Sequence, residues 1–364
     1  MNVPVSNALQ ARIAGLIAAQ GPISVAQYMT LALHDPQDGY YVTRPVLGAA
    51  GDFTTAPEIS QMFGEMLGLW CVQVWHDQGQ PRRKRLVELG PGRGTMMRDA
   101  LRAAKVAAEF LDGLEVVLVE ASPVLQQAQA EKLKDCGVKL RWVPHFESSL
   151  TDQPLFLLAN EFFDAMPLRQ YVKTARGWCE RMVVVRDDVL DFALAPTPVP
   201  AALIAASRAG APEGSVYEVA PAATALAQEI GRVVAEKGGG ALFVDYGYGE
   251  AAGFGETLQA VGGHKFADVL ADPGENDLSA HVDFAALAQA GRHGGAAAYG
   301  PRDQGEFLAD LGITGRAEQL MSTNPAAAQS LFAAIERLIG PGQMGTLFKA
   351  MAFVPPSAAN PPGF

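Results

Sequence analysis

The segment Leu86-Val87-Glu88-Leu89-Gly90-Pro91-Gly92-Arg93-Gly94-Thr95 predicts a buried strand, a glycine-rich turn and the start of a helix. The three alternate glycines, Gly90, Gly92 and Gly94, let a ligand approach the backbone where a side chain would clash. Ligands of open α/β folds bind at the carboxyl ends of parallel strands. The segment therefore predicts a nucleoside cofactor, with a ligand-free strand–helix turn as the structural alternative.

The spacing around this turn favours S-adenosylmethionine over a dinucleotide. A nicotinamide fingerprint reads G-x-G-x-x-G, and Thr95 stands where its third glycine would be. The next predicted strand ends in Glu120, whose carboxylate can accept hydrogen bonds from two ribose hydroxyls. S-adenosylmethionine has no phosphate and so requires no lysine, and Glu88 can attract its ammonium group. We therefore expect Glu88, Glu120 and the three glycines to bind this cofactor.

A second group of polar residues follows the apolar strand predicted at 155–159. Asn160 and Glu161 end this strand, and Asp164 lies three residues further on. In a doubly wound sheet the end of this strand faces the reactive part of the cofactor. Two carboxylates at an apolar strand end are costly without a cationic partner. We predict that Asn160 contacts the cofactor and that Glu161 and Asp164 are catalytic; capping of the next turn is the alternative for either acid.

Three further segments are weaker candidates. Residues 51–58 (GDFTTAPE) form a polar stretch before a helix, and we expect them to close over the cofactor with Thr55 as a contact. Thr55 or Asp52 as a helix cap is the alternative. The strand end at 245–248 and the turn at 279–283 could face the substrate, but a capping or core role explains them equally well.

Composition limits the class of protein. The 364 residues carry a formal net charge of −11, which argues against nucleic acid or an anionic membrane as a general partner. The three cysteines are far apart and form no CxxC pair, and the histidines have no metal-ligand spacing. No apolar run is long enough to span a membrane, and the N-terminus resembles neither a signal nor a transit peptide. We expect a cytoplasmic protein without a bound metal.

Strands alternate with helices from residue 86 onward, which predicts an α/β fold with a doubly wound, mostly parallel sheet. We expect an antiparallel meander at 168–195 added to this sheet and a final edge strand at 346–354. The expected organisation is an N-terminal helical or lid segment (1–80), a cofactor-binding core (81–195 and 238–354), a helical insertion (196–237) and a disordered tail (355–364).

Seven segments, in this order, make the chain resemble the MidA-like family, bacterial relatives of the mitochondrial protein arginine methyltransferase that assists complex I assembly. They are HDPQDGYY (34–41), GDFTTAPEISQMFGE (51–65), VELGPGRGTMM (87–97), LVEASPVL (118–125), NEFFDAMP (160–167), VDYGY (244–248) and DLSAHVDF (277–284). The resemblance implies a class I methyltransferase fold with a seven-stranded Rossmann-like sheet. It also implies that Gly90, Gly92, Gly94 and Glu120 bind S-adenosylmethionine.

The resemblance implies a protein arginine N-methyltransferase of the complex I assembly-factor type. It implies a protein substrate, and we take a complex I subunit and a second copy of the chain (a homodimer) as candidate partners. Three alternatives stay open: a methyltransferase of a small molecule or another side chain, a nicotinamide-dependent oxidoreductase, and a catalytically silent assembly chaperone.

Overall fold

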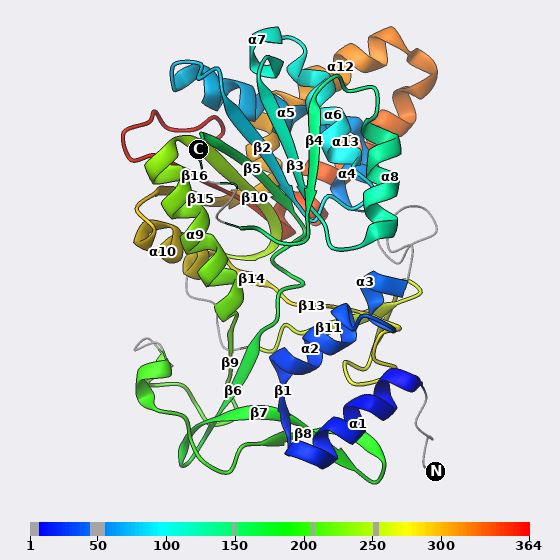
Figure 1. Cartoon of the computed structure of the whole chain (residues 1–364), viewed down its shortest axis with the longest axis vertical. Coiled ribbons are helices and arrows are strands. Elements are labelled where there is room, and N and C mark those ends of the chain that lie inside the picture. The colour runs from blue at the N-terminus through cyan, green and yellow to red at the C-terminus, as the bar shows by residue number, and fades with distance from the viewer. Residues whose placement is uncertain (1–6, 44–54, 148–149, 151, 205–207, 250–254) are drawn as a thin grey trace.

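The structure is a computed structural model that describes residues 7–43, 55–147, 150, 152–204, 208–249 and 255–364. Figure 1 shows a larger unit around a central sheet and a smaller unit below it, which contains the N-terminal helices and a second sheet. The helices are α1 (Ala8–Gln20), α2 (Val25–His34), α3 (Tyr40–Thr43), α4 (Ala56–Ile59), α5 (Gln61–Asp77), α6 (Thr95–Ala104), α7 (Ala108–Leu111), α8 (Pro123–Leu133), α9 (Pro221–Lys237), α10 (Phe284–His293), α11 (Gln304–Asp310), α12 (Ile313–Thr323), α13 (Ala328–Ile339) and α14 (Met344–Leu347).

The strands fall into three sheets. They are β1 (Ile23–Ser24), β2 (Lys84–Leu89), β3 (Leu114–Val119), β4 (Lys139–Val143), β5 (Leu155–Asn160), β6 (Arg169–Thr174), β7 (Gly177–Arg186), β8 (Val189–Leu194), β9 (Val216–Val219), β10 (Gly239–Tyr248), β11 (Gln259–Gly262), β12 (Lys265–Ala267), β13 (Asp277–Ser279), β14 (Val282–Asp283), β15 (Ala297–Asp303) and β16 (Phe348–Val354).

The main sheet has the order β15-β16-β10-β5-β2-β3-β4, with β14 beside the end of β10. Strands β4, β3, β2, β5 and β10 are parallel, and β16 runs antiparallel to both of its neighbours. The order reverses beside β2, so the crevice at its carboxyl end is the expected ligand position. This is the doubly wound α/β fold that the sequence predicts. The last strand is not at the edge, because β16 lies between β15 and β10.

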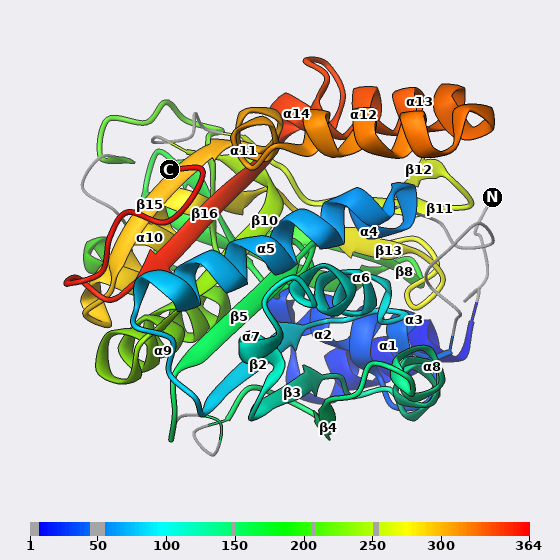
Figure 2. The ribbon, with the colours of Figure 1, turned by 90° about the horizontal axis from the view of Figure 1, so that it is seen from above.

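The central strands are buried on both sides because each face of the sheet is covered by helices. On β2, Leu86 packs with α5 and α6 in one apolar cluster, whereas Val87 packs with α9 and α10 in another. Successive side chains of a strand point to opposite faces, so a continuous apolar run supplies both clusters. Figure 2 shows α5 and α6 lying along one face of the sheet. The candidate functional site lies at the carboxyl ends of these strands.

The smaller unit has its own core. Strands β1, β6, β7, β8 and β9 form an antiparallel sheet, and β11, β12 and β13 form another. Helices α1 and α2 pack against residues of both sheets in a third apolar cluster. The predicted meander is therefore antiparallel, as expected, but it belongs to a separate sheet. It does not extend the main sheet, because β6 pairs with β7 and β9.

Two segments differ from their predicted state. The stretch 196–237, expected to be a helical insertion, contributes β9 to the second sheet and α9 to the cover of the main sheet. The tail, expected to be disordered, packs against the larger unit: the Trp70 indole donates to the carbonyl of Pro362 at 3.2 Å, and the Phe364 ring lies 5.2 Å from that of Phe307. Proline content alone did not reveal these long-range partners.

Helix boundaries also shift. The helix expected after the polar stretch 51–58 is broken at Ser60, whose backbone is extended and whose hydroxyl accepts from the Met62 amide to cap α5. Of the described helices, none is long and apolar enough to cross a membrane.

Candidate functional site

The glycine turn lies between β2 and α6 at the carboxyl edge of the main sheet. Gly90, Gly92 and Gly94 have φ values of 60°, 52° and 76°, in the left-handed region that favours glycine. A Cβ on Gly90 would lie 3.0 Å from Cδ2 of Phe162. Because this contact is tighter than ordinary packing, the loop after β5 lies directly against the turn. The strand, turn and helix are therefore placed as the sequence predicts.

Glu88 is buried beside this turn without a partner for one of its oxygens. Its Oε2 is a buried atom with no hydrogen bond in the described structure, and burial raises the pKa of the carboxyl to about 8. A buried carboxylate is stabilised only by a cation or by hydrogen bonds. A ligand with an ammonium group would supply both, so Glu88 fits the amino-acid end of S-adenosylmethionine.

Glu120 follows β3 and is held by Ser122 and Gln129. Its Oε1 accepts from the Ser122 amide at 2.8 Å, and its Oε2 accepts from Nε2 of Gln129 at 3.3 Å. The same Nε2 donates to the carbonyl of Gly92 at 2.7 Å, so Gln129 joins the acid to the turn. Burial raises the pKa of Glu120, and these bonds oppose the shift. No role for Gln129 was predicted from the sequence, although a glutamine on the inner face of α8 could have indicated one.

The short helix α4 connects the cofactor turn with the acids after β5. Glu58 accepts from the Thr95 hydroxyl at 2.5 Å, and Lys132 donates to that hydroxyl at 2.7 Å. The Ala56 amide donates to Oε1 of Glu161 at 3.2 Å. Thr55, predicted to contact the cofactor, is the residue before α4, and its side chain makes no capping bond. The alternative cap, Asp52, lies outside the described residues.

Glu161 is half-buried directly after β5 and has a strained backbone. Its φ is 50°, which is uncommon for a residue with a side chain. Its Oε1 also accepts from Nδ2 of Asn160 at 3.0 Å, while Oδ1 of Asn160 is buried without a hydrogen bond in the described structure. Burial raises the pKa of Glu161 to about 7, and the nearby Asp164 adds to the shift. Such strain often marks a functional position.

Asp245, at the end of β10, holds the loop that carries Asp164. Its Oδ2 accepts from the amides of Phe162, Phe163 and Asp164 at 3.1, 3.0 and 3.3 Å. Burial, then the charges of Asp164 and Glu161, raise the pKa of Asp245 well above its usual range. Asp245, which the sequence marked only as a weak candidate, thus holds this loop, while the Asp164 carboxylate accepts from the Ala165 amide, as the capping alternative expects.

Asp164 differs from the other two acids, because one of its carboxylate oxygens has no partner among the described residues. Its Oδ1 is buried with no hydrogen bond in the described structure, and burial raises its pKa to about 6 despite an opposing hydrogen bond from Tyr246. Within the described ranges, no Lys or Arg forms an ion pair with Glu161, Asp164 or Asp245. Arg337 on α13 only lowers the pKa of Glu161 through its charge. Glu161, Asp164 and Asp245 therefore lie close enough to affect one another's pKa, and we call them the acid cluster.

Segments far apart in the sequence meet around Asp164. The amide of Ala280 donates to its carbonyl at 2.9 Å. Tyr41 donates to Asp277 at 2.9 Å, and the charge of Asp164 contributes to raising the pKa of Tyr41. The Tyr246 and His281 rings pack edge to face, 5.6 Å apart. The structure thus brings together parts of 34–41, 160–167, 244–248 and 277–284, which the sequence marked separately.

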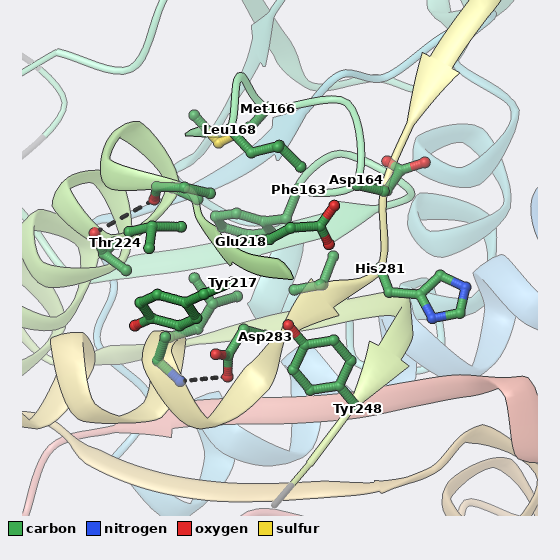
Figure 3. A pocket seen from close by; sticks show the side chains of 17 residues that line it. Phe163, Asp164, Met166, Leu168, Tyr217, Glu218, Thr224, Tyr248, His281 and Asp283 are labelled. Atoms are coloured by element: carbon green, nitrogen blue, oxygen red, sulfur yellow. Dashed lines mark hydrogen bonds between the residues drawn. The ribbon is translucent and has the colours of Figure 1, made fainter. Parts of the chain in front are cut away.

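A cavity continues from Asp164 toward the smaller unit (Figure 3). It lies between the loop after β5, the start of α9, the start of α10 and the ends of β9 and β10. Its lining includes aromatic and acidic side chains: Phe163, Asp164, Tyr217, Glu218, Tyr248 and Asp283. Within the described ranges, no group of three His, Cys, Asp or Glu residues is arranged to hold a metal ion.

Comparisons with known proteins agree on the chemistry. Residues 66–302 match the family described as "Putative S-adenosyl-L-methionine-dependent methyltransferase". The chain is 37% identical over 370 residues to "Protein arginine methyltransferase NDUFAF7, mitochondrial" of Homo sapiens, covering 93% of this chain and 81% of that protein. The Danio rerio protein of the same name is 37% identical over 372 residues, covering 95% and 86%.

A solved structure shows the same fold with a product-like ligand. The crystal structure of a Burkholderia thailandensis protein bound to S-adenosyl-homocysteine superposes with a TM-score of 0.85 and 31% sequence identity. The superposition covers 97% of this chain and 95% of that one. The match therefore includes both units of the molecule.

Proposed function

The chain belongs to the family of S-adenosyl-L-methionine-dependent methyltransferases, and we propose that it methylates an arginine side chain of a protein. The relatives named above are called protein arginine methyltransferases. The observation that carries the proposal is the acid cluster, in which Asp164 has a buried oxygen without a partner and no described cation forms an ion pair. A guanidinium would supply the missing positive charge and up to five N–H donors.

The residues of the glycine turn fit the cofactor. When bound, S-adenosylmethionine supplies a methyl group on a sulfonium, and its departure leaves a neutral thioether. Glu88 would attract the ammonium group, the glycines would lie against the amino-acid part, and Glu120 would accept from the ribose hydroxyls. The unpartnered Oδ1 of Asn160 can accept a further hydrogen bond from the cofactor.

The acid cluster would make the acceptor reactive mainly by positioning it. A guanidinium is a weak nucleophile because its charge is delocalised. Carboxylates on two sides can hold it by charge-assisted hydrogen bonds and draw positive charge away from the attacking nitrogen. Glu161 and Asp164 are placed for this role. Since their pKa values are about 7 and about 6, either carboxylate can also accept the proton that the methylated nitrogen loses.

The finer identity of the substrate is a prediction. We infer a protein substrate from the names of the relatives, and a complex I subunit is the first candidate. The relatives named above are mitochondrial, and a cytoplasmic location of this chain is a prediction. The homodimer is likewise a prediction, and sedimentation of the purified chain would measure the oligomeric state.

The experiment is a methyl-transfer assay. Purified protein is incubated with radiolabelled S-adenosylmethionine and an extract of cells that lack its gene, and labelled proteins are digested and analysed by mass spectrometry. We expect methylarginine in one or a few proteins. Label on a small molecule or on another residue type would overturn the arginine assignment. Cofactor binding without any labelled product would instead support the silent assembly chaperone.

A further inference from the structure

We propose that the cavity beyond Asp164 receives the side chain of the acceptor arginine, with Asp283 as a further carboxylate contact beside the pair of Glu161 and Asp164. The inference rests on the proposed function and adds the route and the contacts of the substrate. We call this space the acceptor cavity. Asp164 is one of its lining residues, and its walls come from both units of the molecule (Figure 3).

The walls suit a long side chain with an apolar stem. Phe163, Met166 and Leu168 line one side, and Val282 and Leu287 contribute further apolar surface. Phe163 and Leu168 are each 4% exposed, so these walls are part of a packed core and not a mobile surface. Arginine has three methylene groups before its charged head and can bury them against such surface.

Two carboxylates of the cavity remain available to a ligand. Asp283 uses Oδ1 to cap α10 by accepting from the Ala286 amide at 2.9 Å, and no other described residue bonds to this carboxylate. Asp164 has its unpartnered Oδ1. Both acids contribute to the electrostatics of neighbouring tyrosines: Asp283 raises the pKa of Tyr248, after burial, and Asp164 does so for Tyr246.

Glu218, the third acid that lines the cavity, is occupied by hydrogen bonds that stabilise the fold. It accepts from the Thr257 amide and hydroxyl at 3.1 and 2.5 Å, from the Leu258 amide at 3.3 Å and from Nε2 of Gln170 at 2.8 Å. These four bonds fix the approach to β11 beside β9. Glu218 therefore adds negative charge to the cavity, while Asp164 and Asp283 keep capacity for a ligand. Asp283 is therefore the acid to substitute, and Glu218 is left unchanged.

Aromatic rings favour a guanidinium over an ammonium. Tyr217 and Tyr248 both line the cavity. On Tyr217 the structure already shows the interaction, since the guanidinium carbon of Arg208 lies 5.4 Å from the ring centroid. Figure 3 shows the Tyr248 ring between Asp283 and His281. A planar guanidinium can stack on this ring and still donate to carboxylates at its edge, which a lysine ammonium does less well.

An anionic or purely apolar ligand fits these walls poorly. The acids Asp164, Glu218 and Asp283 would repel an anion, and an apolar ligand would leave the two open carboxylates without partners. Burial lowers the pKa of His281, which lines the cavity. The charge of Arg208 beside Tyr217 offsets part of the effect of the acids on the pKa of Tyr217 and Tyr248.

The test uses two variants that keep the fold. Asp283→Asn removes the charge but preserves the α10 cap, because asparagine is an equally good N-cap residue. Tyr248→Leu removes the ring, and Tyr248→Phe keeps it. Glu229→Gln, which removes an α9 carboxylate paired with Arg232 outside the cavity, is the charge-matched control.

We expect Asp283→Asn and Tyr248→Leu to raise the KM for the protein acceptor about tenfold with little change in kcat, because one charge-assisted contact or one ring is lost. Tyr248→Phe and Glu229→Gln should match the wild type, and the affinity for S-adenosyl-homocysteine should be unchanged in all four variants. An unchanged acceptor KM in Asp283→Asn and Tyr248→Leu would overturn the inference while arginine methylation stands.

A binding measurement separates this inference from the proposed function. The full chain loaded with S-adenosyl-homocysteine is titrated with N-acetyl-arginine methylamide, and with the neutral citrulline analogue as control. We expect the arginine probe to bind, the citrulline probe not to bind, and Asp283→Asn to weaken the arginine probe about tenfold. If the arginine probe binds, the citrulline probe does not, and no methylarginine forms in the extract, then the cavity is a guanidinium site and the proposed function fails. Equal binding of both probes would overturn the inference.

Discussion

The cofactor side and the acceptor side of the site are assembled in different ways. The cofactor side is mostly local: Glu88 and the three glycines come from β2 and the turn after it, and Glu120 and Gln129 follow in the next strand and helix. The acceptor side joins loops after β5 and β10 with segments of the smaller unit. A site formed by one continuous segment can be predicted from the sequence, whereas the contacts between distant segments that form the acceptor side cannot be.

The two sides also differ in how their buried charge is satisfied. Glu120 on the cofactor side accepts bonds from Ser122 and Gln129, and Glu88 is a single unpartnered acid. On the acceptor side Asp245 is buried, and Glu161 and Asp164 are half-buried. Burial, then the charge of Asp164, raises the pKa of the other two. Since burial disfavours the charged form, a cationic ligand would stabilise these carboxylates. The predictions below test this contrast.

The largest effect should come from removing the acid that organises the acceptor side. Asp245→Ala leaves the amides of Phe162, Phe163 and Asp164 without their shared acceptor. We expect a loss of roughly 3–5 kcal/mol in the free energy of unfolding, because a buried network loses its centre. Urea denaturation would measure it.

Glu88→Gln is the matched control for this stability loss, since it also removes a buried carboxylate, but one with an unpartnered oxygen. We expect it to leave the ligand-free protein as stable as the wild type or more stable near neutral pH. If Asp245→Ala were as harmless as Glu88→Gln, the role of Asp245 as the anchor of this loop would be wrong.

Glu161→Gln should separate catalysis from cofactor binding. The substitution keeps the shape and one hydrogen-bond acceptor but removes the charge that would hold the guanidinium. We expect kcat to fall roughly a hundredfold to a thousandfold, as when a preorganised electrostatic contact is lost. Single-turnover methyl transfer to the acceptor would measure it.

The control for Glu161→Gln is Glu131→Gln, at an exposed position on α8 that pairs with Lys134. This variant should retain the wild-type rate, and both variants should bind S-adenosyl-homocysteine normally. A wild-type rate in Glu161→Gln would remove the acid from the mechanism.

Much of the fold could be predicted because its causes are local. The apolar runs at 114–119 and 155–160 are strands that bury both faces. The sequence predicted the antiparallel strands at 168–195, but not that they form a separate sheet, which the four-residue strand β9 joins by pairing with β6. The ordered tail likewise depends on Trp70, nearly 300 residues away in the chain.

The site follows the same rule. Glu88, the glycines and Glu120 were found from spacing, and Glu161 and Asp164 from their place after an apolar strand. The anchoring role of Asp245 depends on amides about 80 residues away, and no local pattern signals it. The acceptor cavity has walls from both units, so nothing in any one segment indicates it.

The pH dependence of stability should reveal the unpaired Glu88. Its pKa is raised to about 8, so the folded state keeps a proton that the unfolded state releases near pH 4.5. A raised carboxyl pKa contributes stability at low pH that is lost as the pH rises toward 8. We expect this residue alone to lower the free energy of unfolding by roughly 2–3 kcal/mol between about pH 5 and pH 7.

Urea denaturation of the wild type and of Glu88→Gln across this pH range would isolate the contribution, because Glu161 and Asp164 remain in both proteins. The variant should have the flatter profile. Saturation with S-adenosyl-homocysteine should flatten the wild-type profile as well, since the ligand ammonium stabilises the carboxylate. Parallel profiles of the two proteins without ligand would show that Glu88 titrates normally.

The smallest expected effect concerns the contact that links the two sides. Thr95 donates to Glu58 on α4 and accepts from Lys132 on α8, so its hydroxyl holds α4 next to the glycine turn. Thr95→Val keeps the shape but loses both bonds, and Thr95→Ser keeps the hydroxyl. Because the bonds involve charged but partly exposed partners, we expect a loss of about 1 kcal/mol in cofactor binding, or roughly fivefold in Kd. Calorimetry with S-adenosyl-homocysteine would measure it.

The same variant also tests the link between the two sides, since the Ala56 amide of α4 donates to Glu161. We expect Thr95→Val to raise the acceptor KM slightly. An effect on cofactor binding alone would show that the two sides are independent.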